Sequence, residues 1–226
     1  MEKKRSLAQK VNIMRAAVMG ANDGILSVAG IVIGVAGATD NNYAIFLAGI
    51  AGMLAGTVSM AMGEYVSVNA QKDAQKKAII QQKSALSLNY DGEVSYVRDK
   101  YVLKGIQPEL ATKAASEMMK KDALLTSVRE RFGFDISEFT SPYAAALSSM
   151  ISFPLGSILP LLAITMLPES IKVFATFISV VIALAITGFI AAVLGNSNRR
   201  NSVIRNVISG ILTMLVTYGI GTLIGR

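Results

Sequence analysis

Hydrophobic residues gather in five long runs along the chain, separated by short polar stretches and by one long one. Each run reaches or exceeds the ~20 residues that a helix needs to cross a hydrocarbon core of ~30 Å. Inside that core the backbone N–H and C=O groups must be satisfied within the chain, so each run is expected to form a helix. The predicted spans cover residues about 12–38, 43–66, 143–167, 171–194 and 203–225.

The long polar stretch, residues 71–141, lies between the second and third spans and predicts a soluble helical insert. Residues 1–70 then carry the first two spans, and residues 142–226 carry the other three. We expect these two parts to form one membrane domain. Two prolines, Pro154 and Pro160, predict a kink in the third span, because proline removes an internal hydrogen bond.

Three helices are expected inside the insert. Residues 71–88 continue the second span, because no breaker separates Glu64 from Leu88, and a second helix covers residues 93–104. Pro108 suits the first position of a third helix, which runs to about Phe132. That helix carries an ion-pair ladder of Lys113, Glu117 and Lys121. Its apolar stripe at helical spacing comprises Leu110, Ala114, Met118, Leu125, Val128 and Phe132.

The composition agrees with a membrane protein. Apolar residues make up 52% of the chain and charged residues 16%, and the mean hydropathy is +0.49. The predicted fold class is therefore an all-α integral membrane protein with five transmembrane helices. A signal peptide is the competing interpretation of the first run. However, the run is about twice the usual 7–15 residues and contains Asp23, so we expect it to remain as a span.

The distribution of the 22 basic residues predicts the orientation. Five precede or begin the first span (Lys3, Lys4, Arg5, Lys10 and Arg15), twelve lie in the insert, and Arg199, Arg200 and Arg205 flank the fourth turn. Only Lys172 and Arg226 fall on the opposite side. Basic residues favour cytoplasmic loops, so the N-terminus and the insert are expected in the cytosol and the C-terminus outside. The net charge of +7 then reflects topology and lipid contact, and no nucleic-acid partner is implied.

Histidine and cysteine are both missing from the sequence. This excludes disulfides and thiolate metal sites, and it removes the commonest proton shuttle and transition-metal ligand. The sequence has no nucleotide-binding loop, nucleophile elbow or metalloprotease motif, so neither an enzyme nor a bound cofactor is predicted. The remaining ligands are carboxylates, amides, hydroxyls and methionine sulfur.

Asp23 is the first candidate ligand. It lies in Gly20-Ala21-Asn22-Asp23-Gly24, inside the first span. A carboxylate near the bilayer centre costs ~2.5–3.5 kcal/mol on insertion scales, so such a residue indicates an ion or proton path. The alternative is that Asp23-Gly24 forms a turn that interrupts the run.

Asn22, Met60 and Glu64 are the other candidates in the spans. Met60 and Glu64 are four residues apart and share one helix face, whereas Met62 points elsewhere. A thioether beside a carboxylate favours transition metals over Mg²⁺ and Ca²⁺. Two alternatives stay open: methionine as apolar filler, and Glu64 as a solvated charge at the end of the span.

Glycines recur four residues apart in the spans, and small residues at that spacing let membrane helices approach closely. The sequence leaves two interpretations open, packing within the chain or the seam of a homodimer. The positions concerned are Gly20, Gly24, Gly30, Gly34, Gly49, Gly52, Gly56, Gly63, Gly221 and Gly225.

Two longer motifs, residues 15–24 (RAAVMGANDG) and 54–68 (LAGTVSMAMGEYVSV), resemble the vacuolar iron transporter family, and the likeness covers nearly the whole chain. The resemblance implies a five-helix homodimer with its ion path near the two-fold axis. It also implies export of Fe²⁺ or Mn²⁺ from the cytosol in exchange for protons, here across a bacterial cytoplasmic membrane. The family's intramembrane aspartate falls on Asp23 and its helix-two methionine on Met60. Glu64 belongs to the Gly-Glu-Tyr element at the cytosolic mouth.

The insert departs from the family's iron-storing members, which carry a glutamate cluster with methionines there. The first helix of this insert has lysines and glutamines instead, and the second keeps Glu93 almost alone. Twelve basic and ten acidic residues do not make a cation trap, so a soluble metal store is not expected and Mn²⁺ becomes an alternative to Fe²⁺. The weaker ligand candidates are Glu93, Glu117, Met118, Met119 and Asp122.

A second function from another class is a membrane scaffold or sensor whose basic insert binds a cytosolic partner. The intramembrane carboxylate favours transport, because a scaffold gains nothing from Asp23.

Overall fold

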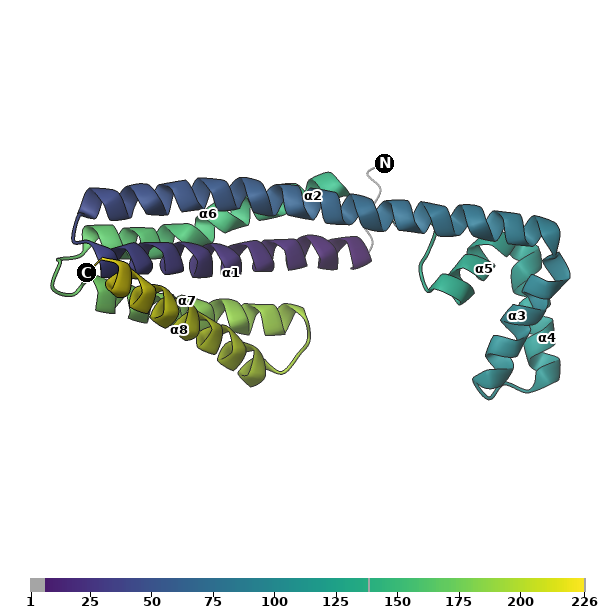
Figure 1. Ribbon diagram of the computed structural model, residues 1–226. Helices are drawn as coiled ribbons and strands as arrows, with labels where there is room; N and C mark the ends of the chain where they lie inside the picture. The colour runs from purple at the N-terminus through teal and green to yellow at the C-terminus, as the bar shows by residue number, and fades with distance from the viewer. Residues whose placement is uncertain (1–6, 138, 226) are drawn as a thin grey trace, which may run out of the picture. The chain divides into compact units, whose positions relative to one another are not determined.

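The computed structural model describes residues 7–137 and 139–225, so Lys3, Lys4, Arg5 and Arg226 of the charge argument lie outside the described residues. Over the described ranges the chain folds into eight helices, and these ranges contain no strand (Figure 1). The helices are α1 (Leu7–Ala38), α2 (Asn42–Leu88), α3 (Tyr90–Leu103), α4 (Pro108–Lys121), α5 (Ala123–Phe132), α6 (Pro142–Met166), α7 (Lys172–Leu194) and α8 (Arg199–Ile224).

Five of these helices are long and apolar enough to cross a membrane: α1 from Gln9 onward, α2, α6, α7 and α8. This confirms the all-α membrane fold with five spans. The chain divides into two compact units. The membrane unit comprises Lys10–Val66 and Ser141–Arg226, and the insert unit is built around Ser67–Thr140.

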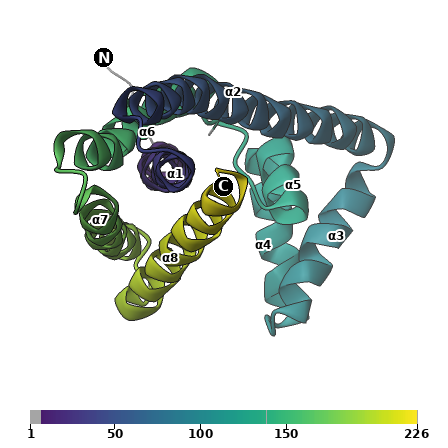
Figure 2. The same ribbon diagram turned by 60° about the vertical axis from the view of Figure 1, so that its left-hand side comes forward.

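In the membrane unit, α1 lies between α2, α6, α7 and α8, as Figure 2 shows in a view along the axis of α1. All five spans contribute to one apolar core, so α1 is the helix most enclosed by protein. The buried core residues are Ile25, Val28, Ala29, Val32, Ile33, Ile45, Phe153, Leu161, Ile164, Val180, Leu184 and Met214.

Glycines bring α1 against its neighbours. A Cβ atom on Gly24 would run into the backbone carbonyl of Phe153 in α6, and one on Gly221 of α8 would run into the carbonyl of Gly34. At these positions the glycine spacing therefore serves packing within the chain. Gly63, in contrast, has no neighbouring atom within 4 Å of an added Cβ.

Hydroxyl groups of α6 strengthen the same contact. Ser148 and Ser149 donate to the carbonyls of Ile13 and Ala16 at 3.0 and 3.2 Å. Ser157 donates to the Gly24 carbonyl at 3.2 Å and to the Phe153 carbonyl of its own helix at 2.8 Å. These bonds fix α1 along the half that carries Asp23. Pro154 and Pro160 lie within α6, which runs from Pro142 to Met166 as a single helix.

The insert unit packs α3, α4 and α5 beside the end of α2. Its core is formed by Val97, Ala115 and Met119. The helix expected from Pro108 to about Phe132 is in fact two helices, because Asp122 has an extended backbone (φ −158°, ψ 94°). Its side chain accepts a hydrogen bond from the Leu125 N–H at 2.9 Å and so caps α5.

In α4 the apolar stripe was placed wrongly by one residue, whereas Val128 of α5 is fully buried as predicted. The buried positions of α4 are Ala111, Ala115 and Met119, whereas Leu110 is 59% exposed. Helix α3 begins at Tyr90, earlier than residue 93, because the Asn89 side chain caps it by accepting from the Gly92 N–H at 2.9 Å.

Candidate metal site

Asp23 lies in the middle of α1, and the helix continues through it. The alternative of a turn at Asp23-Gly24 is therefore wrong. The side chain is half-buried, and its Oδ1 accepts a hydrogen bond from the Ser27 hydroxyl, one turn along, at 3.0 Å. Within residues 7–137 and 139–225, no lysine or arginine forms an ion pair with this carboxylate. A carboxylate so placed is free to bind a mobile cation.

Asn22, although adjacent in sequence, faces a different neighbour. Its Oδ1 accepts a hydrogen bond at 3.3 Å from the hydroxyl of Thr187 in α7, which also donates to the Leu184 carbonyl at 3.2 Å. The Asn22 amide thus joins α1 to α7. Adjacent side chains of a helix point about 100° apart, so Asn22 and Asp23 face different directions.

Met60 and Glu64 lie on the side of α2 that faces the other spans. Met60 is half-buried and packs against the core, whereas Met62 is 54% exposed. Glu64 is 6% exposed, and its Oε2 forms an ion pair with the Arg15 guanidinium of α1 at 3.2 Å. The structure does not favour the alternative of Glu64 as a solvated end charge.

The register of α1 and α2 brings the candidates to a common level. Arg15 contacts Glu64, and farther along Gly52 lies against the side chain of Ile31, so the two helices are antiparallel. With a rise of ~1.5 Å per residue in opposite directions, Met60 lies level with the α1 turn between Met19 and Asp23. Glu64 correspondingly lies level with Arg15, about one turn nearer the start of α1.

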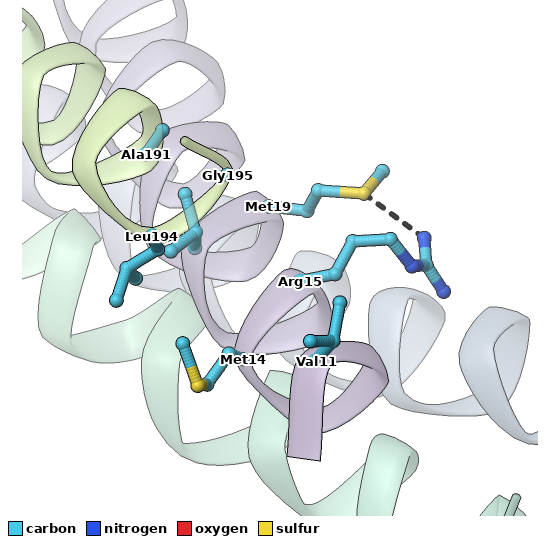
Figure 3. A pocket seen from close by; sticks show the side chains of 8 residues that line it. Val11, Met14, Arg15, Met19, Ala191, Leu194 and Gly195 are labelled. Atoms are coloured by element: carbon cyan, nitrogen blue, oxygen red, sulfur yellow. Dashed lines mark hydrogen bonds between the residues drawn. The ribbon is translucent and has the colours of Figure 1, made fainter. Parts of the chain in front are cut away.

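Arg15 and Met19 lie beside Glu64 and Met60, and neither was among the predicted ligands. The Arg15 guanidinium donates to Asn12 Oδ1 at 3.1 Å, to Met19 Sδ at 3.1 Å and to Glu64 Oε2 at 3.2 Å. Arg15, Met19 and Asp23 are spaced four residues apart, a pattern that could have indicated one shared face of the helix. Arg15 and Met19 also line a cavity of about 330 Å³ between the first half of α1 and the end of α7 (Figure 3).

In the insert unit, Glu93 is held by residues of the same unit. Both of its oxygens accept from Arg131 at 2.9 Å, and Oε2 also accepts from Gln82 at 2.6 Å. Arg131 in turn lies 3.8 Å from the centre of the Tyr96 ring.

Glu130, a second acid of the insert, is likewise paired. It accepts from the Tyr101 hydroxyl at 3.0 Å and lies 3.4 Å from the Lys100 ammonium and 3.9 Å from that of Lys104. Burial, together with the hydrogen bond to Glu130, raises the pKa of Tyr101 above its ordinary value, so the tyrosine remains a neutral donor.

The four weaker candidates of the insert do not converge. Met119 is 1% exposed in the core, Asp122 caps α5, and Glu117 is exposed on α4. The Met118 sulfur accepts a hydrogen bond from the Tyr101 hydroxyl at 3.8 Å. Across the described residues, no group of three or more acidic side chains is gathered to hold a metal ion.

The chain was compared with known proteins. The sequence model of the VIT family matches residues 14–222. The vacuolar iron transporter of Acanthamoeba castellanii is 33% identical over 223 residues, which cover 98% of this chain and 82% of that protein. Vacuolar iron transporter homolog 2.1 of Arabidopsis thaliana is 33% identical over 222 residues, covering 96% and 84% of the two chains. Vacuolar iron transporter homolog 1 of Oryza sativa subsp. japonica is 33% identical over 213 residues, covering 94% and 74%. The resemblance found in the two long motifs is thereby confirmed, and the chain belongs to the VIT family.

Proposed function

We propose that this protein transports a divalent transition-metal ion, Fe²⁺ or Mn²⁺, from the cytosol across the membrane in exchange for protons. The observation that carries the proposal is Asp23, a half-buried carboxylate in the middle of a membrane span with no cationic partner among the described residues. The relatives named as vacuolar iron transporters support a metal ion as the substrate.

The coupling to protons follows from the chemistry of that carboxylate. A metal ion binds the deprotonated form, so it must displace a proton from Asp23, and a returning proton releases the metal. Such an exchange moves metal in one direction and protons in the other, provided that the site opens to the two sides in turn.

We propose that Asp23 and Met60 bind the ion inside the membrane and that Glu64 attracts it at the cytosolic mouth, with Asn22 a less direct contributor. A second copy of the chain would complete the site in a homodimer. Two observations support this: the described residues contain no group of three or more acidic side chains that could hold a metal ion, and the Asp23 side chain is only half-buried.

The direct test is transport into proteoliposomes that carry a pH gradient. Fe²⁺, Mn²⁺, Zn²⁺ and Ca²⁺ are compared side by side at equal concentration. Uptake of Fe²⁺ or Mn²⁺ that alkalises the lumen in step with the metal flux supports exchange with protons, because the protons must leave as the metal enters. Equal uptake of all four ions, or metal flux without proton flux, contradicts the proposal.

A further inference from the structure

The guanidinium of Arg15 occupies a position that would suit a metal ion. It is in contact with a carboxylate oxygen, an amide oxygen and a thioether sulfur, each at 3.1–3.2 Å. These are the three kinds of ligand atom that remain in a chain without histidine and cysteine. Asn12 and Met19 come from α1, and Glu64 comes from α2, so the cluster joins the two helices of the path.

The position of this cluster is as telling as its composition. Arg15 lies eight residues from Asp23 along α1, which separates them by about 12 Å along the helix axis and about 80° around it. It lies toward the end of the membrane unit from which α2 continues into the insert. An ion that approaches Asp23 from that end passes the Arg15 cluster first.

A guanidinium stays charged in proteins. Arg15 can therefore make room for a metal ion only by moving away from Glu64. The Glu64 side chain is 7% exposed and that of Arg15 is 47% exposed, so the acid is enclosed while the base can still move. A divalent ion that reaches Glu64 repels Arg15 and competes with it for the same oxygens.

We propose that Arg15 is a tethered cation that occupies the outer metal site of the path, and that Glu64, Met19 and Asn12 become ligands of the transported ion when Arg15 withdraws. This inference rests on the proposed transport function, because it assigns the first binding step of that function. While Arg15 occupies the outer site, no metal ion can bind there. Its positive charge then balances the Glu64 carboxylate until a metal ion arrives.

The structure also offers a place for the displaced side chain. The cavity of about 330 Å³ is lined by Arg15 itself and by Ala191, Leu194 and Gly195 at the end of α7 (Figure 3). The carbonyls of Ala191 and Val193 there already accept backbone N–H groups, so what the helix end offers a cation is the negative end of the helix dipole. A change of side-chain rotamer would move the guanidinium from Glu64 toward this helix end without a backbone rearrangement.

The test is equilibrium binding of Fe²⁺ under anaerobic conditions to the full-length purified protein. All variants carry Asp23→Asn, which removes the inner carboxylate and leaves the outer site. Arg15→Gln keeps the chain length and removes the charge. Its dissociation constant for Fe²⁺ should fall by at least about fivefold, the factor that corresponds to the ~1 kcal/mol of a partly exposed ion pair.

Matched variants separate this effect from a general change of charge. Arg199→Gln removes an equal charge from a residue that stacks on Phe189, and it should leave the affinity unchanged. In the Arg15→Gln protein, Glu64→Gln and Met19→Leu should each weaken binding again. Met14→Leu should not weaken binding, because Met14 lines the same cavity but its sulfur is not one of the atoms that the Arg15 guanidinium contacts.

A folding defect is controlled by size-exclusion chromatography and by Arg15→Lys. The shorter ammonium keeps the charge but cannot reach all three acceptors, so an intermediate affinity is expected.

If Arg15→Gln and Arg199→Gln bind Fe²⁺ equally, the inference is wrong even when the wild-type protein transports metal. If the wild-type protein transports no divalent ion, the transport proposal itself fails. Tighter binding by Arg15→Gln would then identify a regulatory metal site and not a step of transport.

Discussion

At the scale of single residues, Asp23 carries the strongest expectation. Asp23→Asn keeps the shape of the side chain and removes its charge, so it should abolish metal transport while the protein still purifies as the same oligomer. The reason is that the amide can neither balance a divalent charge nor exchange a proton.

The matched control for this substitution is Asp40→Asn, the same change in the exposed turn between α1 and α2. Transport assays in proteoliposomes compare the two variants with the wild type at several pH values. Wild-type uptake should decline as the metal-donating side is acidified, because protons compete for the carboxylate. Full activity of Asp23→Asn would remove this residue from the path.

Met60 and Met62 offer a second comparison at the same scale. Met60→Leu conserves the volume and removes the sulfur from the core-facing side of α2, so selectivity for Fe²⁺ over Ca²⁺ and Mg²⁺ should fall several-fold with little loss of expression. Met62→Leu alters an exposed residue about 200° away and should change nothing. Ion-competition assays measure both, and identical behaviour would show that the thioether is filler.

Part of this site could be predicted from the sequence. Asp23 and Glu64 are conspicuous because charges within apolar runs are costly. Arg15 was not identified as a partner of Glu64, because that contact depends on the register of two helices, which the sequence does not state. Met19 and Asn12 were missed for the same reason: such a residue can be recognised as a possible ligand only when its neighbours on the other helix are known.

At the scale of helices, the contact between α1 and α6 decides where Asp23 is held. Gly24→Ala should destabilise the membrane unit by several kilocalories per mole, because the added methyl group meets a backbone carbonyl that has no rotamer to change. The measurement is the melting temperature of the protein in detergent. Gly219→Ala is the control, since no atom lies within 4 Å of its added Cβ and alanine favours a helix by about 1 kcal/mol. Equal melting temperatures for the two variants would contradict the close-contact interpretation.

The insert helices carry the next prediction. Because Arg131 and Gln82 hold Glu93, and Lys100 and Lys104 hold Glu130, a metal ion would have to break existing pairs before it could bind. Calorimetric titration of the full-length protein with Fe²⁺ or Mn²⁺ should therefore change little on Glu93→Gln. A tight site of several ions that disappears with Glu93→Gln would instead restore a storage role for the insert.

Prediction was more accurate for the spans than for the insert. Long apolar runs in a membrane have only one available structure, so their helices could be located to within a few residues. In the insert, Asp122 was read as part of a continuous helix, but the same residue type is also a favoured N-cap, and here it caps α5. Two adjacent methionines made the stripe ambiguous, and tertiary packing selected Met119 over Met118.

At the scale of the whole molecule, the orientation remains the main prediction. We expect Ser67–Thr140 in the cytosol and the turn between α1 and α2 on the opposite side. Lys172, the one described basic residue on that opposite side, is 3% exposed and donates to Asn42 Oδ1 at 2.7 Å, so it adds no open positive charge there. The asymmetry of exposed basic residues is thus greater than the sequence count suggests.

Single cysteines test this orientation cleanly, because the natural chain has none. Asn41→Cys, in the turn after α1, should react with a membrane-impermeant maleimide added to intact cells, whereas Ser87→Cys, at an exposed position of α2, should react only after the cells are opened. A cysteine-free protein is the blank. Labelling of both positions from one side would rule out an odd number of spans between the two faces.

The serine bonds between α6 and α1 also have a consequence for synthesis. Their partners are separated by 133 to 135 residues in the chain. At ~5–20 residues per second, α1 waits roughly 7 to 27 seconds before the α6 serines have been made. During that time the half of α1 that holds Asp23 and Arg15 lacks the helix that will fix it. We therefore expect membrane proteases to cleave a nascent chain more readily before α6 has been made than after it.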